Sequence, residues 1–138
     1  MPSVSILYPV FCMVLLTMVV SLKLMTVNVK ASKKRQVPVK YFALYKGPVP
    51  DDLIQARDHY KNLFELPVLF YLLCLLIYAG ADVQLPDLVL AWAFVLSRAI
   101  HSFIRASSNR VPRRFVVFFT GFLILLIHWS FFSFRIIF

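Results

Sequence analysis

The chain has few charged residues, only two cysteines, and no segment in which apolar and polar residues alternate. Only 15% of its 138 residues are charged, while 61% are hydrophobic and the mean hydropathy is +0.81. Soluble globular domains carry about 25% charged residues, so this composition argues against a soluble protein. The missing alternation excludes a membrane β-barrel as well.

The two cysteines, Cys12 and Cys74, lie inside apolar segments and form no CxxC pair. No neighbouring set of metal-ligand residues accompanies them. Because a buried cysteine most often acts as a small hydrophobic residue, we expect neither a disulfide nor a metal site.

What the chain does contain is four long apolar segments, at Val4–Val29, Leu53–Gly80, Leu85–Ile104 and Phe115–Phe138. Each supplies the ~20 residues that a helix needs to cross a hydrocarbon core of ~30 Å. The first segment lacks a basic region before it and a small-residue cleavage site after it, so we interpret it as a true span rather than a signal peptide. We therefore predict one all-α domain over residues 1–138, an integral membrane four-helix bundle with spans at about 4–29, 53–80, 85–107 and 112–138.

Acidic residues are scarce, which leaves a net charge of +9 from 15 basic and 6 acidic residues. The basic residues gather in two loops, one between the first and second spans and one between the third and fourth. The turn between the second and third spans holds Asp82 and Asp87 and no basic residue. By the positive-inside rule both basic loops are expected in the cytoplasm and both termini on the other side. Most of the lysines are expected to set this topology and to contact anionic lipids. No nucleic-acid partner is expected, since the basic loops adjoin membrane spans.

Two groups of polar residues interrupt the apolar spans. Asp58, Asn62 and Glu65 follow one helical face at i, i+4 and i+7, and Arg57 and Lys61 lie beside them. Glu65 is about 18 Å along its helix at 1.5 Å per residue, near the inner margin of the hydrocarbon.

The third span ends in Arg98, His101 and Arg105, spaced i, i+3 and i+7. Arg98 approaches the depth of Glu65 from the other direction, so an ion pair between them is a reasonable prediction. Ionisable groups at this depth are costly and usually functional. The alternative is that such a pair only holds two helices together.

The string from Arg57 to Pro67, RDHYKNLFELP, resembles the second-helix signature of the MAPEG family, the membrane-associated proteins in eicosanoid and glutathione metabolism. The continuation through Tyr71 and the stretch from Trp92 to His101 resemble bacterial members in particular. The resemblance implies a homotrimer in a bacterial inner membrane, with glutathione as cofactor between neighbouring subunits near the cytoplasmic face.

Four residues match the family pattern directly: Asn62 and Glu65 in the second helix, and Arg98 and His101 in the third. Arg114 matches the arginine that family members use near the thiol of glutathione. Other positions differ. Asp58 stands where the eukaryotic enzymes have arginine, with Arg57 one residue earlier. Phe115 replaces a serine, Arg105 replaces a tyrosine, and no tyrosine follows Tyr78.

Glutathione carries two carboxylates and one ammonium at neutral pH, so a basic ring suits it. In the predicted site its carboxylates are bound by arginines, and Glu65 either takes the ammonium or orients an arginine. Asn62 and His101 complete the cofactor-binding set, whose arginines are Arg57, Arg98, Arg105 and Arg114. A guanidinium beside the thiol would lower the thiol pKa. With the tyrosine replaced, Arg114 and Arg105 are the candidate catalytic residues.

The sequence thus predicts a membrane-bound glutathione-dependent transferase or peroxidase that acts on lipophilic electrophiles or lipid hydroperoxides. Two alternatives stay open. One is a non-catalytic protein that binds a lipid or small molecule in the same cleft, which the missing tyrosine favours. The other is a structural membrane protein whose buried charges only specify packing.

Overall fold

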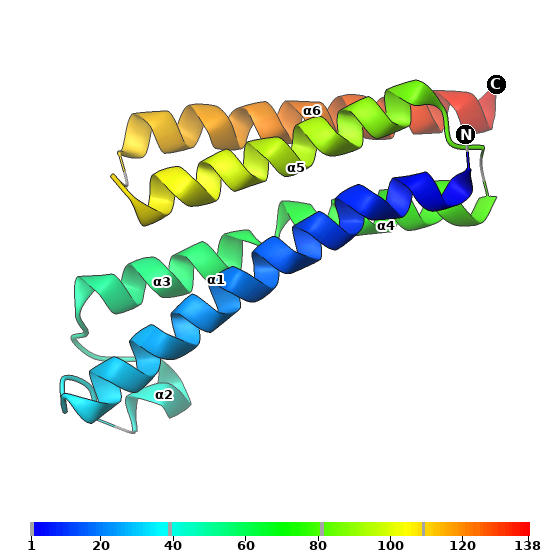
Figure 1. The fold of residues 1–138 in the computed structure, drawn as a ribbon. Coiled ribbons are helices and arrows are strands. Elements are labelled where there is room, and N and C mark those ends of the chain that lie inside the picture. The colour runs from blue at the N-terminus through cyan, green and yellow to red at the C-terminus, as the bar shows by residue number, and fades with distance from the viewer. Residues whose placement is uncertain (1, 39, 81, 109) are drawn as a thin grey trace.

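A computed structural model describes residues 2–38, 40–80, 82–108 and 110–138 (Figure 1). Every regular element in these ranges is a helix: η1 (Ser3–Ile6), α1 (Leu7–Lys33), α2 (Tyr41–Leu44), α3 (Asp51–Asn62), α4 (Leu66–Gly80), α5 (Leu85–Ala106) and α6 (Val111–Ile137). The prediction of an all-α chain is confirmed.

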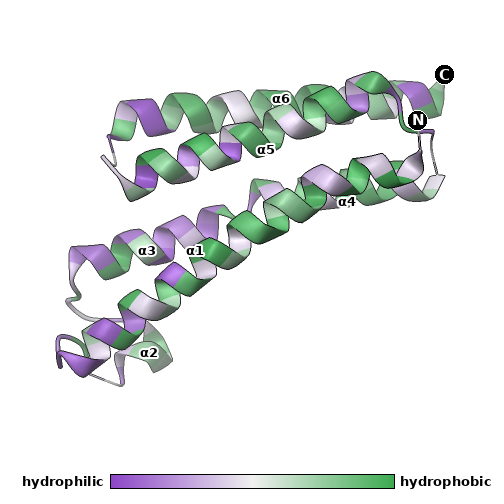
Figure 2. Ribbon diagram, viewed as in Figure 1, coloured by the Kyte–Doolittle hydropathy of each residue, from purple (hydrophilic) through white to green (hydrophobic). Residues whose placement is uncertain are grey.

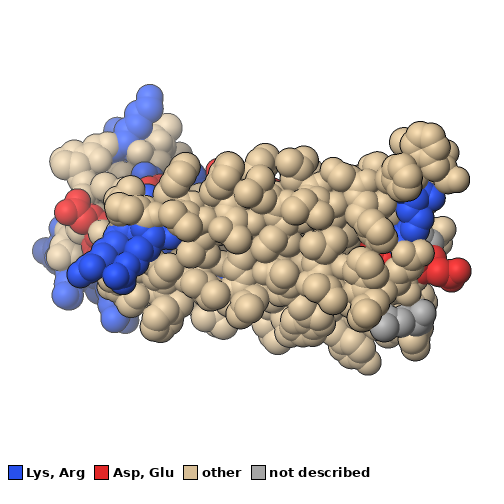
Figure 3. All heavy atoms as spheres, turned by 90° about the horizontal axis from the view of Figure 1, so that it is seen from above, with Lys and Arg blue, Asp and Glu red and all other residues tan. Residues whose placement is uncertain are grey.

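Within the described residues, four helical segments are long and apolar enough to cross a membrane: Ser3–Lys33, Asp51–Gly80, Leu85–Ala106 and Val111–Ile137. Hydrophobic residues dominate the middle of these helices, and polar residues are denser at the end that contains α2 and α3 (Figure 2). On the face seen in Figure 3 the charged side chains gather towards the two ends of the long axis. The chain is therefore a multi-pass integral membrane protein.

Two pairs of helices carry most of the packing. α5 packs along α6, and α1 packs on α3 and α4 (Figure 1). The pairs meet in a core that contains Phe70 of α4 and Phe94 of α5, whose rings stack at 4.7 Å between centroids. Both aromatic side chains are fully buried. This core joins α4 to α5 in the apolar middle of the bundle.

The sequence suggested that the second span is one continuous helix, but the structure divides it into two. α3 ends at Asn62 and α4 begins at Leu66, with a turn at residues 63–65. In this turn the backbone N–H groups of Leu63 and Phe64 bond to carbonyls only three residues back. Pro67 explains the break, because proline has no N–H to continue the ladder and its ring collides with the carbonyl four residues earlier. Glu65 thus lies in a turn and is exposed.

At the basic end of the bundle, the chain leaves α1 through a tight reversal. Arg35 has a φ of 52°, its N–H bonds to the Ser32 carbonyl, and the N–H of Gln36 bonds to the Ala31 carbonyl. This is a Schellman arrangement, which satisfies the last carbonyls of a helix. It returns the chain so that Tyr41 of α2 packs with Leu53 of α3 in a small separate core.

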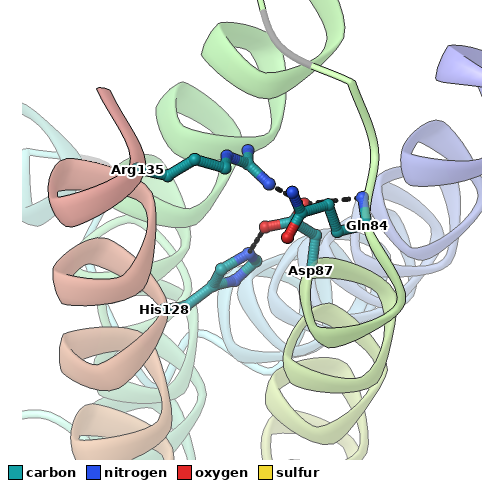
Figure 4. A network of polar contacts seen from close by, with 4 residues as sticks. All are labelled: Gln84, Asp87, His128 and Arg135. Carbon is teal, nitrogen blue, oxygen red and sulfur yellow. Dashed lines mark hydrogen bonds and ion pairs between the residues drawn. The ribbon is translucent and has the colours of Figure 1, made fainter. Parts of the chain in front are cut away.

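At the opposite end, a buried carboxylate ties α5 to α6 (Figure 4). Asp87 accepts a hydrogen bond from the backbone N–H of Gln84, which completes a capping box at the start of α5. Arg135 of α6 donates to the same carboxylate oxygen at 2.8 Å, and His128 Nε2 lies 3.5 Å from the other oxygen. Asp87 and His128 are fully buried. The sequence placed Asp87 in a turn, whereas it lies in the first turn of α5. His128 and Arg135 are seven residues apart on α6 and share a helical face, so both reach the Asp87 carboxylate.

Replacing Asp87 with alanine should strongly destabilise the protein. The change removes the only carboxylate that pairs with Arg135 in the described chain, and it removes the cap of α5. Breaking a buried pair by deleting one partner costs about 3–5 kcal/mol. Unfolding in detergent should show a lower Tm than for Asp82→Ala, which removes an exposed carboxylate from the segment before α5. Equal Tm values for the two variants would contradict a stabilising role for the pair.

Candidate functional site

A cavity of ≈ 400 Å³ opens between α3, α5 and α6 at the basic end of the bundle. Its polar lining comes from two stretches of the chain that are about forty residues apart. The lining residues are Asp58, Lys61, Asn62, Glu65, His101, Arg105, Val111, Arg114, Phe115 and Phe118. It therefore brings Asn62 and Glu65 of the second-helix motif together with His101 and Arg105 at the end of the third span.

Charges of both signs face this cavity. Lys61, Arg105 and Arg114 are cationic, while Asp58 and Glu65 are carboxylates. Arg105 lies close enough to Asp58, Glu65 and Arg114 to interact electrostatically with all three. Its Nε is buried and has no hydrogen-bond partner among the described residues. An unpaired buried donor costs free energy, so Arg105 is suited to receive an acceptor from a ligand.

The break in the second span positions two of these residues. Asn62 is the last residue of α3, and Glu65 is the last residue of the turn before α4. A carboxylate in an uninterrupted helix would follow the helical face, whereas here the turn sets its direction. The sequence motif thus coincides with a local interruption that Pro67 imposes.

His101 and Phe118 form the inner wall of the cavity. His101 is 3% exposed, and its ring centroid is 5.8 Å from that of Phe118 on α6. The three positions that differ from the family pattern in the sequence, Asp58, Arg105 and Phe115, also line the cavity. None of the described residues that line it is a tyrosine or a serine.

Arg98 does not line this cavity, and the predicted Glu65–Arg98 ion pair is wrong for the single chain. Arg98 is 1% exposed, and its Nη2 donates to the carbonyls of Val117 and Phe118 on α6 at 3.3 and 3.0 Å. Its guanidinium carbon lies 5.0 Å from the centroid of the Phe118 ring. Lipid offers no acceptor, so the buried guanidinium is satisfied by the backbone of the neighbouring helix. Arg98 therefore holds α6, and with it Phe118, against α5.

Arg57 lies elsewhere too. It lines a second cavity, between α1, α2 and α3, where its Nη1 donates to the hydroxyl of Tyr41 at 2.8 Å. Asp58, the next residue along the chain, lines the first cavity. Consecutive residues of a helix point about 100° apart, which explains why the two side chains separate.

Two polar cavity residues, Asp58 and Lys61, were seen in the sequence but not assigned to the site. Asp58, Lys61 and Asn62 are spaced i, i+3 and i+4 and so face one side of α3. That spacing was the available signal. Phe118 carried none, because one phenylalanine among many in an apolar span indicates nothing about its neighbours.

This arrangement can bind a small zwitterion with excess negative charge. Two arginines and a lysine can form charge-assisted hydrogen bonds with carboxylates. The two carboxylates of the cavity can accept from an ammonium group. The described residues include no group of three or more metal-ligating side chains, so nothing in them suggests a metal centre.

Comparison with protein families gives one match, to the family model described as the MAPEG family, over residues 6–132. The match covers almost the whole chain, including both stretches that line the cavity. Comparison with curated proteins and with solved structures finds no match.

Gly121→Ala should loosen the α5–α6 interface that Arg98 stabilises. A Cβ at Gly121 would lie 2.6 Å from Ser97 Oγ and would collide with Arg98 Nη2, so the guanidinium would have to leave its carbonyl acceptors. Overpacking of this kind costs about 1–3 kcal/mol. Thermal unfolding in detergent should show a lower Tm than for the wild-type protein.

Gly80→Ala is the matched control, because nothing lies within 4 Å of its added Cβ. If both glycine variants unfold at the same temperature, the close approach of Gly121 to Arg98 does not stabilise the fold.

Proposed function

Because the chain belongs to the MAPEG family, we propose that it is a membrane-bound glutathione-dependent transferase or peroxidase for lipophilic electrophiles or lipid hydroperoxides. Membership of the family supports a glutathione-related function of a membrane protein in general. The observation that carries the finer proposal is the charge pattern of the first cavity. Three cations and two carboxylates meet there, and glutathione has two carboxylates and one ammonium.

Within this proposal each polar residue has a part. Arg105 and Lys61 bind carboxylates of the peptide, and Glu65 binds its ammonium, with Asn62 adding hydrogen bonds. The buried, unpartnered Nε of Arg105 supports this assignment, since a carboxylate would satisfy it. Arg98 supports the site indirectly, through its contacts to the helix that carries Arg114 and Phe118.

Glutathione, when bound, supplies a thiol that is nucleophilic as the thiolate. Arg114 is the proposed activating residue, because a nearby guanidinium stabilises the thiolate and lowers the thiol pKa. No separate general base is needed once the thiol is ionised. Phe115 and Phe118 give the same cavity an apolar side, which suits a substrate that arrives from the bilayer.

The family's trimeric assembly supports a homotrimer, in which a neighbouring subunit would cover the open side of the cavity.

The positive-inside rule supports a cytoplasmic position for both basic loops in a bacterial inner membrane. A membrane-impermeant thiol reagent applied to cells should then fail to label a cysteine placed at Ser108.

A second candidate is a non-catalytic protein that binds a lipid or small molecule in the same cavity. One observation favours it: the described lining residues provide no tyrosine or serine hydroxyl to contact a thiol. The first candidate requires bound glutathione to be ionised to the thiolate, whereas the second does not.

Arg114→Ala should abolish the thiolate signal of bound glutathione. The purified protein in detergent is titrated with glutathione by calorimetry, and thiolate absorbance is recorded on the same samples. We expect the wild-type protein to bind glutathione and to show a thiolate band. Native mass spectrometry of the same protein should show a complex of three subunits. Arg113→Ala is the matched control, since Arg113 is the adjacent, exposed arginine. Absence of binding at millimolar glutathione would overturn the proposal, and binding without any thiolate band would favour the second candidate.

Glu65→Gln should weaken the binding of glutathione, because it removes the negative charge that is proposed to pair with the ammonium group. Hydrogen bonds to charged groups contribute about 1.5–3 kcal/mol, so the Kd should rise roughly ten- to hundredfold. Calorimetry with the des-amino analogue, glutaryl-cysteinyl-glycine, provides the internal control. The wild-type and Glu65→Gln proteins should bind this analogue equally. An equal loss for both ligands would mean that Glu65 acts on the fold and not on the ammonium.

A further inference from the structure

The second cavity, on the α1 side of α3, is separate from the proposed glutathione site and shares only Lys61 with it. It has a volume of ≈ 290 Å³ and lies where α1, α2 and α3 converge at the basic end of the bundle (Figure 1). Its lining residues are Leu24, Asn28, Tyr41, Tyr45, Leu53, Arg57, Tyr60 and Lys61. Pockets for whole small ligands run from about 300 to 1,000 Å³, so this cavity has room for a compact group.

The charged side chains that line this cavity are all positive. Arg57 and Lys61 are its only ionisable lining residues apart from the tyrosines, and no carboxylate lines it. Arg57 forms no ion pair within the described chain, and its Nε is buried without a hydrogen-bond partner. A donor that is withdrawn from water and left without an acceptor, as Arg57 Nε is, raises the free energy of the site. An anionic acceptor would satisfy this donor and balance the positive charge of the cavity.

The wall around Arg57 is held in a fixed and strained shape. Tyr45 has a φ of 53°, which is rare for a bulky residue, and its N–H bonds to the Tyr41 carbonyl at 2.6 Å. The Tyr41 and Tyr45 rings meet edge to face at 5.6 Å. The Arg57 guanidinium carbon lies 5.8 Å from the centre of the Tyr45 ring, within the range of a cation–π contact. Strain of this kind is concentrated at ligand sites, where it preorganises the contacts.

The surroundings of the cavity indicate an amphiphile. Leu24 and Leu53 make part of the lining apolar, and Leu22, Met25 and Leu44 nearby in the sequence are more than half exposed. Tyrosines at the level where lysines begin on α1 are typical of the headgroup region. Acyl chains of a lipid would run along such apolar side chains while its headgroup enters the cavity.

We propose that this cavity binds the phosphate of an anionic phospholipid from the leaflet beside the basic loops. Arg57 donates to the phosphate from Nε, Lys61 adds a second positive charge, and the hydroxyls of Tyr41 and Tyr60 donate hydrogen bonds. A phospholipid with a choline headgroup is disfavoured, because its quaternary ammonium would meet two cations.

The test measures the thermal shift of the delipidated full-length protein in a neutral detergent, titrated with dioctanoyl phosphatidylglycerol. Dioctanoyl phosphatidylcholine, sn-glycerol 3-phosphate and inorganic phosphate are titrated in parallel. We expect a saturable rise in Tm with phosphatidylglycerol, and smaller or no shifts with the other three. Arg57→Gln should weaken the apparent affinity for phosphatidylglycerol at least about tenfold.

Matched variants separate the site from general surface charge and from misfolding. Arg113→Gln removes the same charge from an exposed position at the same end and should leave the affinity unchanged. Tyr41→Phe keeps the charge and should weaken binding about threefold, and Arg57→Lys should recover part of the affinity. Glutathione binding should be the same in Arg57→Gln as in the wild-type protein, which makes failure of this proposal distinguishable from failure of the proposed function.

Three results would overturn the lipid assignment. One is an equal loss of affinity in Arg57→Gln and Arg113→Gln, which would mean attraction to the basic surface as a whole. Another is a shift with glycerol phosphate or inorganic phosphate as large as with the lipid. The third is an unchanged affinity in Arg57→Gln.

Discussion

The cost of leaving a polar group unpaired in hydrocarbon governs how this bundle is assembled. Lipid offers no hydrogen-bond partner, so a buried charge has to find one on another helix. Arg98 meets this requirement through two carbonyls of α6, and Asp87 meets it through Arg135 of the same helix. The two contacts lie towards opposite ends of the α5–α6 pair. The pair is therefore aligned by polar contacts at two levels, with the apolar core between them.

Much of the fold follows from composition and segment length. Four apolar runs predict four spans, and the charges of the loops mark the basic end. The break at residues 63–65 was not predicted, although Pro67 stands in the sequence, because a proline in a membrane helix can also be accommodated in a kink. The helix that the Arg98 side chain contacts could not be predicted either. The spacing on α5 defines which residues share a face but not which neighbouring helix that face meets.

The candidate site, too, could be predicted only in part from the sequence. Asn62, Glu65, His101, Arg105 and Arg114 meet at one cavity, as their spacing and the family resemblance had suggested. Arg57 was grouped with them because it is basic and nearby in the sequence. It belongs to another cavity, since one step along a helix turns a side chain through about 100°. Only the three-dimensional arrangement reveals that two faces of α3 line different cavities, with Lys61 lining both.

The interruption between Asn62 and Leu66 divides the second span into two separate hydrogen-bond ladders. Helix formation is cooperative, because each new hydrogen bond depends on the turn before it. A ladder that stops transmits neither fraying nor rotation to the one beyond it. Opening of the hydrogen bonds in α3, and with it exchange of the amide protons there, therefore need not spread into the more apolar α4.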